Sequence, residues 1–249
     1  MTMSARLLTP LALSLALVIA LILGHPPASA AEEDEQKDLV EKSRMTLDGF
    51  LADSNMVWFR DHVKEARGVF IMPQLLKAAF FFGGEGGSGV FLVKDDKTGE
   101  WSDPAFYTMA AGSFGFQFGA QASEVVLLVM SRRGVESLLT STFKLGGDVS
   151  VAVGPVGAGI EGSTAMNLSA DLLTFARAKG LFGGISLEGA VIATRDEWNR
   201  DYYGKEVRPT DILVKLAVMN PQSAGLKATL VRAVAGKPLT GQTTAPVPE

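Results

Sequence analysis

The chain has 249 residues, of which 47% are hydrophobic, and a formal net charge of −4 at pH 7. This mildly acidic balance argues against a nucleic-acid-binding protein, because such domains are strongly basic. The sequence has no cysteine and only two histidines, which excludes disulfide bridges and thiolate metal sites, so we expect no metal site and no cofactor.

The N-terminus has the features of a secretory signal peptide. Arg6 supplies a positive start, Leu11 to Leu23 form an apolar run, and Ala28-Ser29-Ala30 is a small-residue cleavage site. We therefore expect an exported protein, periplasmic or secreted, that is either free or peripherally attached to a membrane. The predicted organisation is a signal peptide over 1–30, a disordered acidic start over 31–36, one domain over 37–235 and a disordered tail over 236–249.

Two helices are predicted next, over residues 37–51 and from Met56 to Ala66. The second has one apolar face, because apolar residues recur at spacings of three and four: Met56, Phe59, Val63 and Ala66. A basic stripe of Arg60, Lys64 and Arg67 runs beside that face. Two interpretations stay open. The helix packs on the fold with its charges in water, or its Trp58 and Phe59 enter a lipid headgroup layer while the basic stripe meets phosphates.

The central part of the chain predicts many short, glycine-rich strands. "VFIMP" reads as a strand closed by Pro73, Phe114, Phe116 and Phe118 alternate with small or polar residues, and "EVVLLVM" is continuously apolar. Helices are predicted again over 211–218 and 223–234. The fold class is therefore α+β: a strongly curled antiparallel sheet or partly closed barrel, flanked by N- and C-terminal helices.

Glycines in "FFFGGEGGSGVFLVK" raise the question of a nucleotide site. Gly84, Gly86 and Gly89 fit G-x-G-x-x-G, but a strand-like run follows them where a dinucleotide site needs a helix N-terminus. The pattern also occurs a second time, at Gly157, Gly159 and Gly162. We predict no nucleotide binding. These glycines instead provide turns, bulges and room for close backbone packing.

Several blocks of sequence, taken together and in order, resemble the SYLF-domain family over residues 37–235. The blocks are "ARGVFIMP", "GGEGGSGVFLVK" with "GEWSDPAF", "GFQFGAQASEVVLLVM", "LGGDVSVAVGPVG", "AKGLFGGISLEGAVI" and "YYGKEV". The resemblance implies lipid binding, since eukaryotic relatives bind phosphoinositides through a basic amphipathic N-terminal helix. Some relatives also bind and bundle actin.

The leading hypothesis is a non-enzymatic lipid-binding protein of the cell envelope that contacts phospholipid headgroups. Its predicted lipid-binding residues are Trp58, Phe59, Arg60, Lys64, Arg67 and Lys77, with a secondary basic patch of Arg132, Arg133, Arg177 and Lys179. Solvated loop charges are the alternative for that patch. An integral outer-membrane β-barrel and a protein-interaction module that binds actin-like filaments are the alternative functions. No catalytic residue is predicted, no protein partner is identified, and Trp101 to Pro104 are interpreted as a turn and core element.

Overall fold

The computed structural model describes residues 28–79, 82–114, 119–154, 156, 169–178, 181–183 and 187–236. Its described strands form one sheet in the order β5-β9-β3-β2-β1-β4-β7-β6, with β8 paired to β7. Neighbouring strands are antiparallel except β6 and β7, which are parallel. The strands are β1 (Gly68–Ala79), β2 (Phe82–Val93), β3 (Ala105–Phe114), β4 (Gly119–Val129), β5 (Thr142–Lys144), β6 (Val151–Val153), β7 (Leu172–Ala178), β8 (Leu181–Gly183) and β9 (Val191–Thr194).

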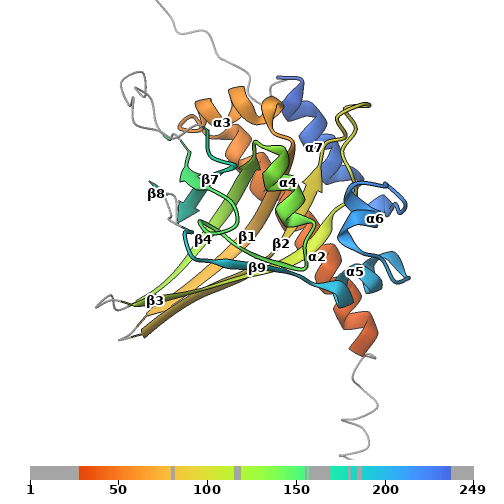
Figure 1. The fold of residues 1–249 in the computed structure, drawn as a ribbon, viewed down its shortest axis with the longest axis horizontal. Coiled ribbons are helices and arrows are strands. Elements are labelled where there is room, and N and C mark those ends of the chain that lie inside the picture. Colours follow the sequence, from red (N-terminus) through yellow and green to blue (C-terminus); the bar gives the residue numbers. More distant parts are fainter. Residues whose placement is uncertain are drawn as a thin grey trace, which may run out of the picture.

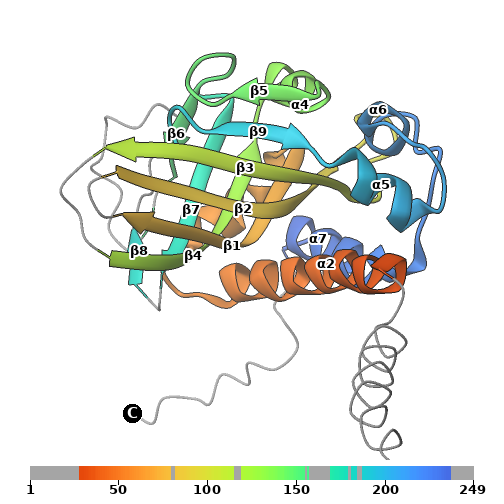
Figure 2. The ribbon, with the colours of Figure 1, turned by 90° about the horizontal axis from the view of Figure 1, so that it is seen from below.

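Helices cover both faces of this strongly curved sheet (Figure 1). In Figure 2, α2 and α7 lie along one side of the sheet, while α4 and α6 lie on the other. The predicted α+β class with flanking terminal helices is confirmed. The helices are α2 (Ala28–Ala52), α3 (Val57–His62), η1 (Val63–Glu65), α4 (Arg132–Leu138), α5 (Asp196–Tyr203), α6 (Pro209–Leu213), η3 (Pro221–Ser223) and α7 (Ala224–Val234).

Each face of the sheet has its own apolar cluster, because side chains along a strand alternate between the two faces. The first cluster includes Phe70 and Leu127 of the sheet and Ile212 of α6. The second includes Ile71 and Val126, their neighbours along the same strands, and extends to α2, α3 and α7. Strands covered on both faces explain why "EVVLLVM" is apolar without interruption.

Pro73 does not end the first strand, contrary to the prediction. The strand β1 continues to Ala79, and its register with both neighbours shifts around Pro73, between Ile71 and Leu76 on one side and between Met72 and Leu75 on the other. A proline cannot donate a ladder hydrogen bond, and a bulge removes the need for one. The strand therefore passes through the proline by bending.

The glycines of "GGEGGSG" lie inside strand β2, with no helix after them. None of Gly84, Gly86 and Gly89 has a positive φ. A Cβ on Gly89 would lie 2.6 Å from the carbonyl oxygen of Ile71, and a Cβ on Gly87 would overlap the carbonyl oxygen of Gln74. Glycine is used here for close approach of β2 to the bulged strand β1, as the sequence predicted, and the left-handed conformations lie elsewhere, for example at Gly99 and Gly204.

The structure shifts several predicted boundaries. Helix α2 begins at Ala28 and so includes the acidic residues that the sequence assigned to a disordered start. The helix predicted over 211–218 ends at Leu213. Other predicted features lie wholly or largely outside the described residues: the signal peptide over 1–30, Phe116, Phe118, the second glycine motif, Lys179 and the tail over 236–249.

Candidate functional site

The predicted amphipathic helix is present as α3 continued by η1, and its apolar face is buried. Met56, Phe59, Val63 and Ala66 have no exposed surface. The ring of Phe59 packs edge-on against Phe175 at 5.1 Å between centroids. Phe59 therefore belongs to the core, and its predicted role in a headgroup layer is incompatible with this structure. The packing half of the prediction is confirmed.

Trp58 lies at the rim of this helix and is half-buried. Its ring stacks on the His62 ring one turn later, with 3.9 Å between centroids and 4° between the planes. The Nδ1 atom of His62 is 2.8 Å from the carbonyl oxygen of Trp58. Val57 beside it is 43% exposed. The outer side of α3 thus presents an apolar and aromatic rim to solvent.

The three residues of the basic stripe have different partners. The Arg60 guanidinium donates to the carbonyl oxygen of Asp53 in the turn that follows α2. Arg67 donates to both carboxylate oxygens of Asp96, at 2.8 and 2.9 Å. Lys64 is exposed and makes no side-chain ion pair within the described residues. Lys64 is therefore the cation of the stripe that is available to a ligand.

Lys94 adds a second amine close to this surface. Its Nζ donates to the backbone carbonyl of Lys64 at 2.6 Å. Partial burial lowers the pKa of Lys94 and the neighbouring Arg67 lowers it further, while Asp96 opposes the shift. We define the α3 surface by Val57, Trp58, Arg60, Lys64 and Arg67.

The other predicted basic residues do not join the α3 surface. Lys77 lies two residues after Leu75 on β1, so both side chains point to the same face of the sheet, which is the face opposite to α3. There Lys77 lies 3.9 Å from Glu85. Arg132 pairs with Glu136 along α4, and Arg133 donates to the backbone of Asp148.

Arg177 of the same predicted patch is separate again. It lies beneath α2 and pairs with Glu124, whereas α4 packs on the opposite face of the sheet. The described members of the secondary patch, Arg132, Arg133 and Arg177, therefore form no single patch.

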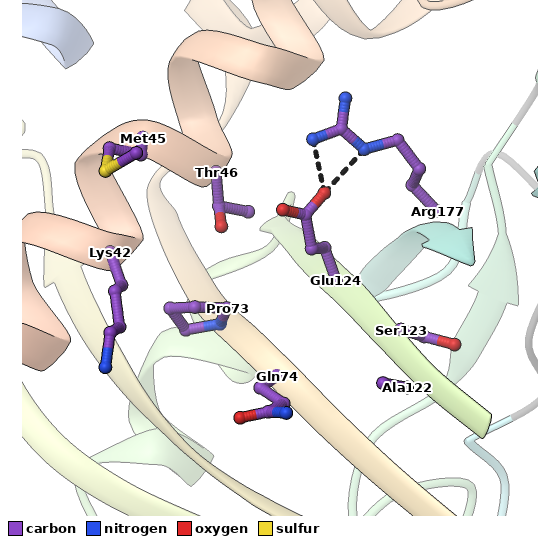
Figure 3. A pocket seen from close by; sticks show the side chains of 9 residues that line it. All are labelled: Lys42, Met45, Thr46, Pro73, Gln74, Ala122, Ser123, Glu124 and Arg177. Carbon is purple, nitrogen blue, oxygen red and sulfur yellow. Dashed lines mark hydrogen bonds and ion pairs between the residues drawn. The ribbon is translucent and has the colours of Figure 1, made fainter. Parts of the chain in front are cut away.

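Sequence reasoning missed a groove between α2 and the sheet. A cavity of about 530 Å³ is lined by Lys42, Met45 and Thr46 of α2, Pro73 and Gln74 of β1, Ala122, Ser123 and Glu124 of β4, and Arg177 of β7 (Figure 3). A neighbouring cavity of about 380 Å³ shares Lys42, Pro73 and Gln74 and reaches Leu76 and Trp198. Only the helical period of α2 and the small residues of β4 hint at the groove in the sequence.

Charged and apolar side chains together line the groove. Arg177 donates to Glu124 at 2.5 Å and lies over the Phe50 ring at 5.6 Å. Gly49 leaves space for the guanidinium, because a Cβ there would lie 2.7 Å from Arg177 Nη2. Met45 is 60% exposed at the groove edge. Six of the nine lining residues are polar or charged, so the groove combines polar and apolar surface. Its volume lies within the range of small-ligand sites.

Asp103 is a structural residue, as the sequence predicted for the Trp101–Pro104 segment. Its side chain is 4% exposed and accepts hydrogen bonds from the Asn220 backbone at 3.0 Å, Ser223 Oγ at 2.6 Å and Lys227 Nζ at 2.8 Å. These contacts tie the start of α7 to the sheet.

The residues that the structure describes contain no group of three or more histidine, aspartate or glutamate side chains arranged to hold a metal ion. None of the helices in these residues has both the length and the apolar character that crossing a membrane requires.

The protein is an α+β domain with a curved sheet and packed terminal helices. Its candidate sites are the α3 surface and the groove beneath α2. Residues 110–233 match the family described as "Ysc84: Las17-binding protein actin regulator". The chain thus belongs to the Ysc84, or SYLF-domain, family. That description names binding and regulation and no chemical reaction.

Relatives of known name agree with this assignment. SH3 domain-containing YSC84-like protein 1 of Bos taurus is 37% identical over 152 residues, 61% of this chain and 44% of that protein. The Homo sapiens protein of the same name is 36% identical with the same coverage. LAS seventeen-binding protein 3 of Saccharomyces cerevisiae is 37% identical over 147 residues, 58% of this chain and 32% of that protein. The chain spans less than half the length of these relatives.

Proposed function

We propose that the protein is a non-catalytic module that binds phospholipid surfaces of the cell envelope through the α3 surface. The observation that carries the proposal is the division of α3 into two sides. One side is in the core, and the other offers Val57, the rim of Trp58 and Lys64 to solvent. An apolar and aromatic rim beside a free lysine suits the headgroup region of a bilayer. Export to the periplasm or medium is part of the proposal.

Variants of the exposed residues test the headgroup contact. Val57→Ser and Lys64→Gln together should weaken flotation with vesicles that contain phosphatidylglycerol, with little change in melting temperature, because neither side chain is in the core. Arg60 and Arg67 are unsuitable targets, because their substitution would also remove contacts within the fold. Arg60 donates to the backbone of Asp53 after α2, and Arg67 donates to Asp96. Lys144→Gln, at an exposed lysine of β5, is the control. Equal flotation of the double variant and wild type would count against the α3 surface.

The groove beneath α2 extends the proposal to an acyl chain. Its apolar lining residues are Met45, Pro73 and Ala122, and its charged ones are Lys42, Glu124 and Arg177. A single apolar chain with an anionic end fits this arrangement of charge and apolar surface. Native mass spectrometry of the purified protein, followed by identification of any released lipid, tests this part. A protein free of lipid that also takes up no added fatty acid would contradict it.

A second candidate function is protein binding, and the comparisons favour it. The matched family is described as Las17-binding, and a yeast relative is named for the same interaction. Crosslinking in intact cells, followed by mass spectrometry, would find a protein partner. Recovery of one specific partner in the absence of any vesicle binding would favour this candidate over the lipid proposal.

A further inference from the structure

The segment between α6 and α7 exposes large apolar side chains. Val214 is 53% exposed, Leu216 38% and Met219 79%. Val218 between them packs against the apolar cluster on the α4 and α6 face of the sheet. We call Val214, Leu216 and Met219 the apolar loop. In Figure 2 the chain from α6 to α7 runs along one edge of the molecule.

The backbone of the apolar loop is strained. Leu216 has φ of 50°, and it is the one residue other than glycine with positive φ within the described residues. A left-handed conformation is unfavourable for a bulky side chain, because its Cβ approaches the following carbonyl oxygen. Glycine or asparagine would satisfy the turn without that cost. A leucine at such a position points to a role for its side chain outside the fold.

Hydrogen bonds hold the strained loop in place. The backbone N–H of Lys215 donates to Thr210 at 3.0 Å, and that of Ala217 donates to Asp211 at 2.9 Å. Asn220 follows the loop and donates to the buried Asp103 from its backbone and to Tyr202 from its side chain. The apolar side chains are therefore presented by an anchored backbone.

The charge around the apolar loop identifies the kind of surface it would meet. The segment from Lys205 to Met219 carries three exposed cations against two anions, Glu206 and Asp211, whereas the whole chain has a net charge of −4. The cations are Lys205, Arg208 and Lys215, of which the last two share Asp211 as a partner. Exposed apolar side chains interspersed with cations match an anionic lipid surface, which accepts the apolar groups and attracts the charges.

We propose that the apolar loop inserts Val214, Leu216 and Met219 into the headgroup region of an anionic lipid surface. This inference rests on the proposed lipid binding and adds a second contact, distant in sequence from the α3 surface. The insertion anchors the molecule through apolar contact, while the exposed Lys205, Arg208 and Lys215 add attraction to lipid phosphates.

Single cysteines test the two contacts separately, because the chain has no cysteine of its own. Met219→Cys, Val57→Cys and Val231→Cys each receive an environment-sensitive fluorophore, and the vesicles are phosphatidylcholine alone or with an equal part of phosphatidylglycerol. The probe at position 219 should brighten several-fold and shift to the blue on mixed vesicles. Val231, 56% exposed on α7, is the control and should stay in a polar environment.

The outcomes separate this inference from the proposed function. A shift at 57 without one at 219 overturns the loop and leaves the α3 surface. A shift at 219 without one at 57 supports the loop and overturns the α3 surface. No fluorescence shift at either position overturns both the loop insertion and the α3 surface.

Leu216→Gly separates binding from folding. Glycine adopts φ of 50° readily, so the melting temperature should stay the same or rise. Vesicle affinity should fall by about tenfold, because one apolar side chain no longer enters the lipid. Unchanged vesicle affinity together with a raised melting temperature would show that Leu216 is strained for another reason and would overturn the proposal.

Discussion

Alanine substitutions along β2 test the role of the glycine-rich segment. At Gly87 an alanine Cβ would overlap the Gln74 carbonyl oxygen and lie 2.8 Å from Met72 Sδ. At Gly84, in the same motif, the nearest atom to the new Cβ is the Ala111 carbonyl oxygen at 3.8 Å, an ordinary contact. The same chemical change is therefore severe at one glycine and harmless at another.

The expected change in the free energy of unfolding depends on which atoms must move to make room for the new Cβ. Overpacking a core costs about 1–3 kcal/mol, and at Gly87 the obstacle is bulged backbone, so we expect a loss of about 3 kcal/mol. For a domain of this size that lowers the melting temperature by about 6–12 °C. Gly84→Ala should be neutral or stabilise by up to about 1 kcal/mol, because alanine has less conformational freedom in the unfolded chain.

Thermal unfolding followed by circular dichroism measures both variants beside wild type. NAD or ATP added to wild type should leave the melting temperature unchanged, because a ligand of the native state would raise it. Equal losses at Gly84 and Gly87, or no loss at Gly87, would refute the claim that these glycines provide room for the bulge of β1.

Three other predictions concern the core and the charges. Asp103→Asn should destabilise by about 3 kcal/mol in urea unfolding, because it leaves a largely buried cation without its partner, and Lys227→Met should cost less; equal costs would contradict this. The Lys215 ammonium and the Arg208 N–H lower the pKa of Asp211 to about 2, so its stabilising effect is present above about pH 3.9 and is lost as the pH falls toward 2; a carbon-13 NMR titration with a midpoint near the ordinary value would refute it. Phe59→Ala should cost about 3–5 kcal/mol and Trp58→Ala less, with reduced vesicle flotation for the latter; the reverse order of stability would contradict the packing of α3.

Much of the fold was predictable from local patterns. The spacing of Met56, Phe59 and Val63 predicted both a helix and its buried face, and the run "EVVLLVM" predicted a strand covered on both sides. Pro73 was misleading, because a missing N–H ends a regular strand and only pairing with two neighbours shows that a bulge replaces the hydrogen bond. The helix predicted over 211–218 was too long, since α6 ends at Leu213 and the chain then turns through a left-handed conformation at Leu216.

The candidate site was less predictable, because it depends on contacts between distant segments. The sequence treated Arg60, Lys64 and Arg67 as equivalent, yet Arg67 meets an aspartate that lies 29 residues away. The sequence allowed Phe59 to be either a core residue or a lipid contact, and the structure buries it in the core. The groove beneath α2 requires a helix and three strands to come together, and the helical period of α2 and the small residues of β4 do not predict that contact.

Binding of the purified wild-type protein to lipid vesicles, measured at low and high salt, tests the central claim most directly. We predict that the protein partitions onto vesicles with phosphatidylglycerol, less onto phosphatidylcholine alone, and less again in high salt, which screens the cationic contacts. A protein that stays in solution with every vesicle composition at low salt would contradict the account.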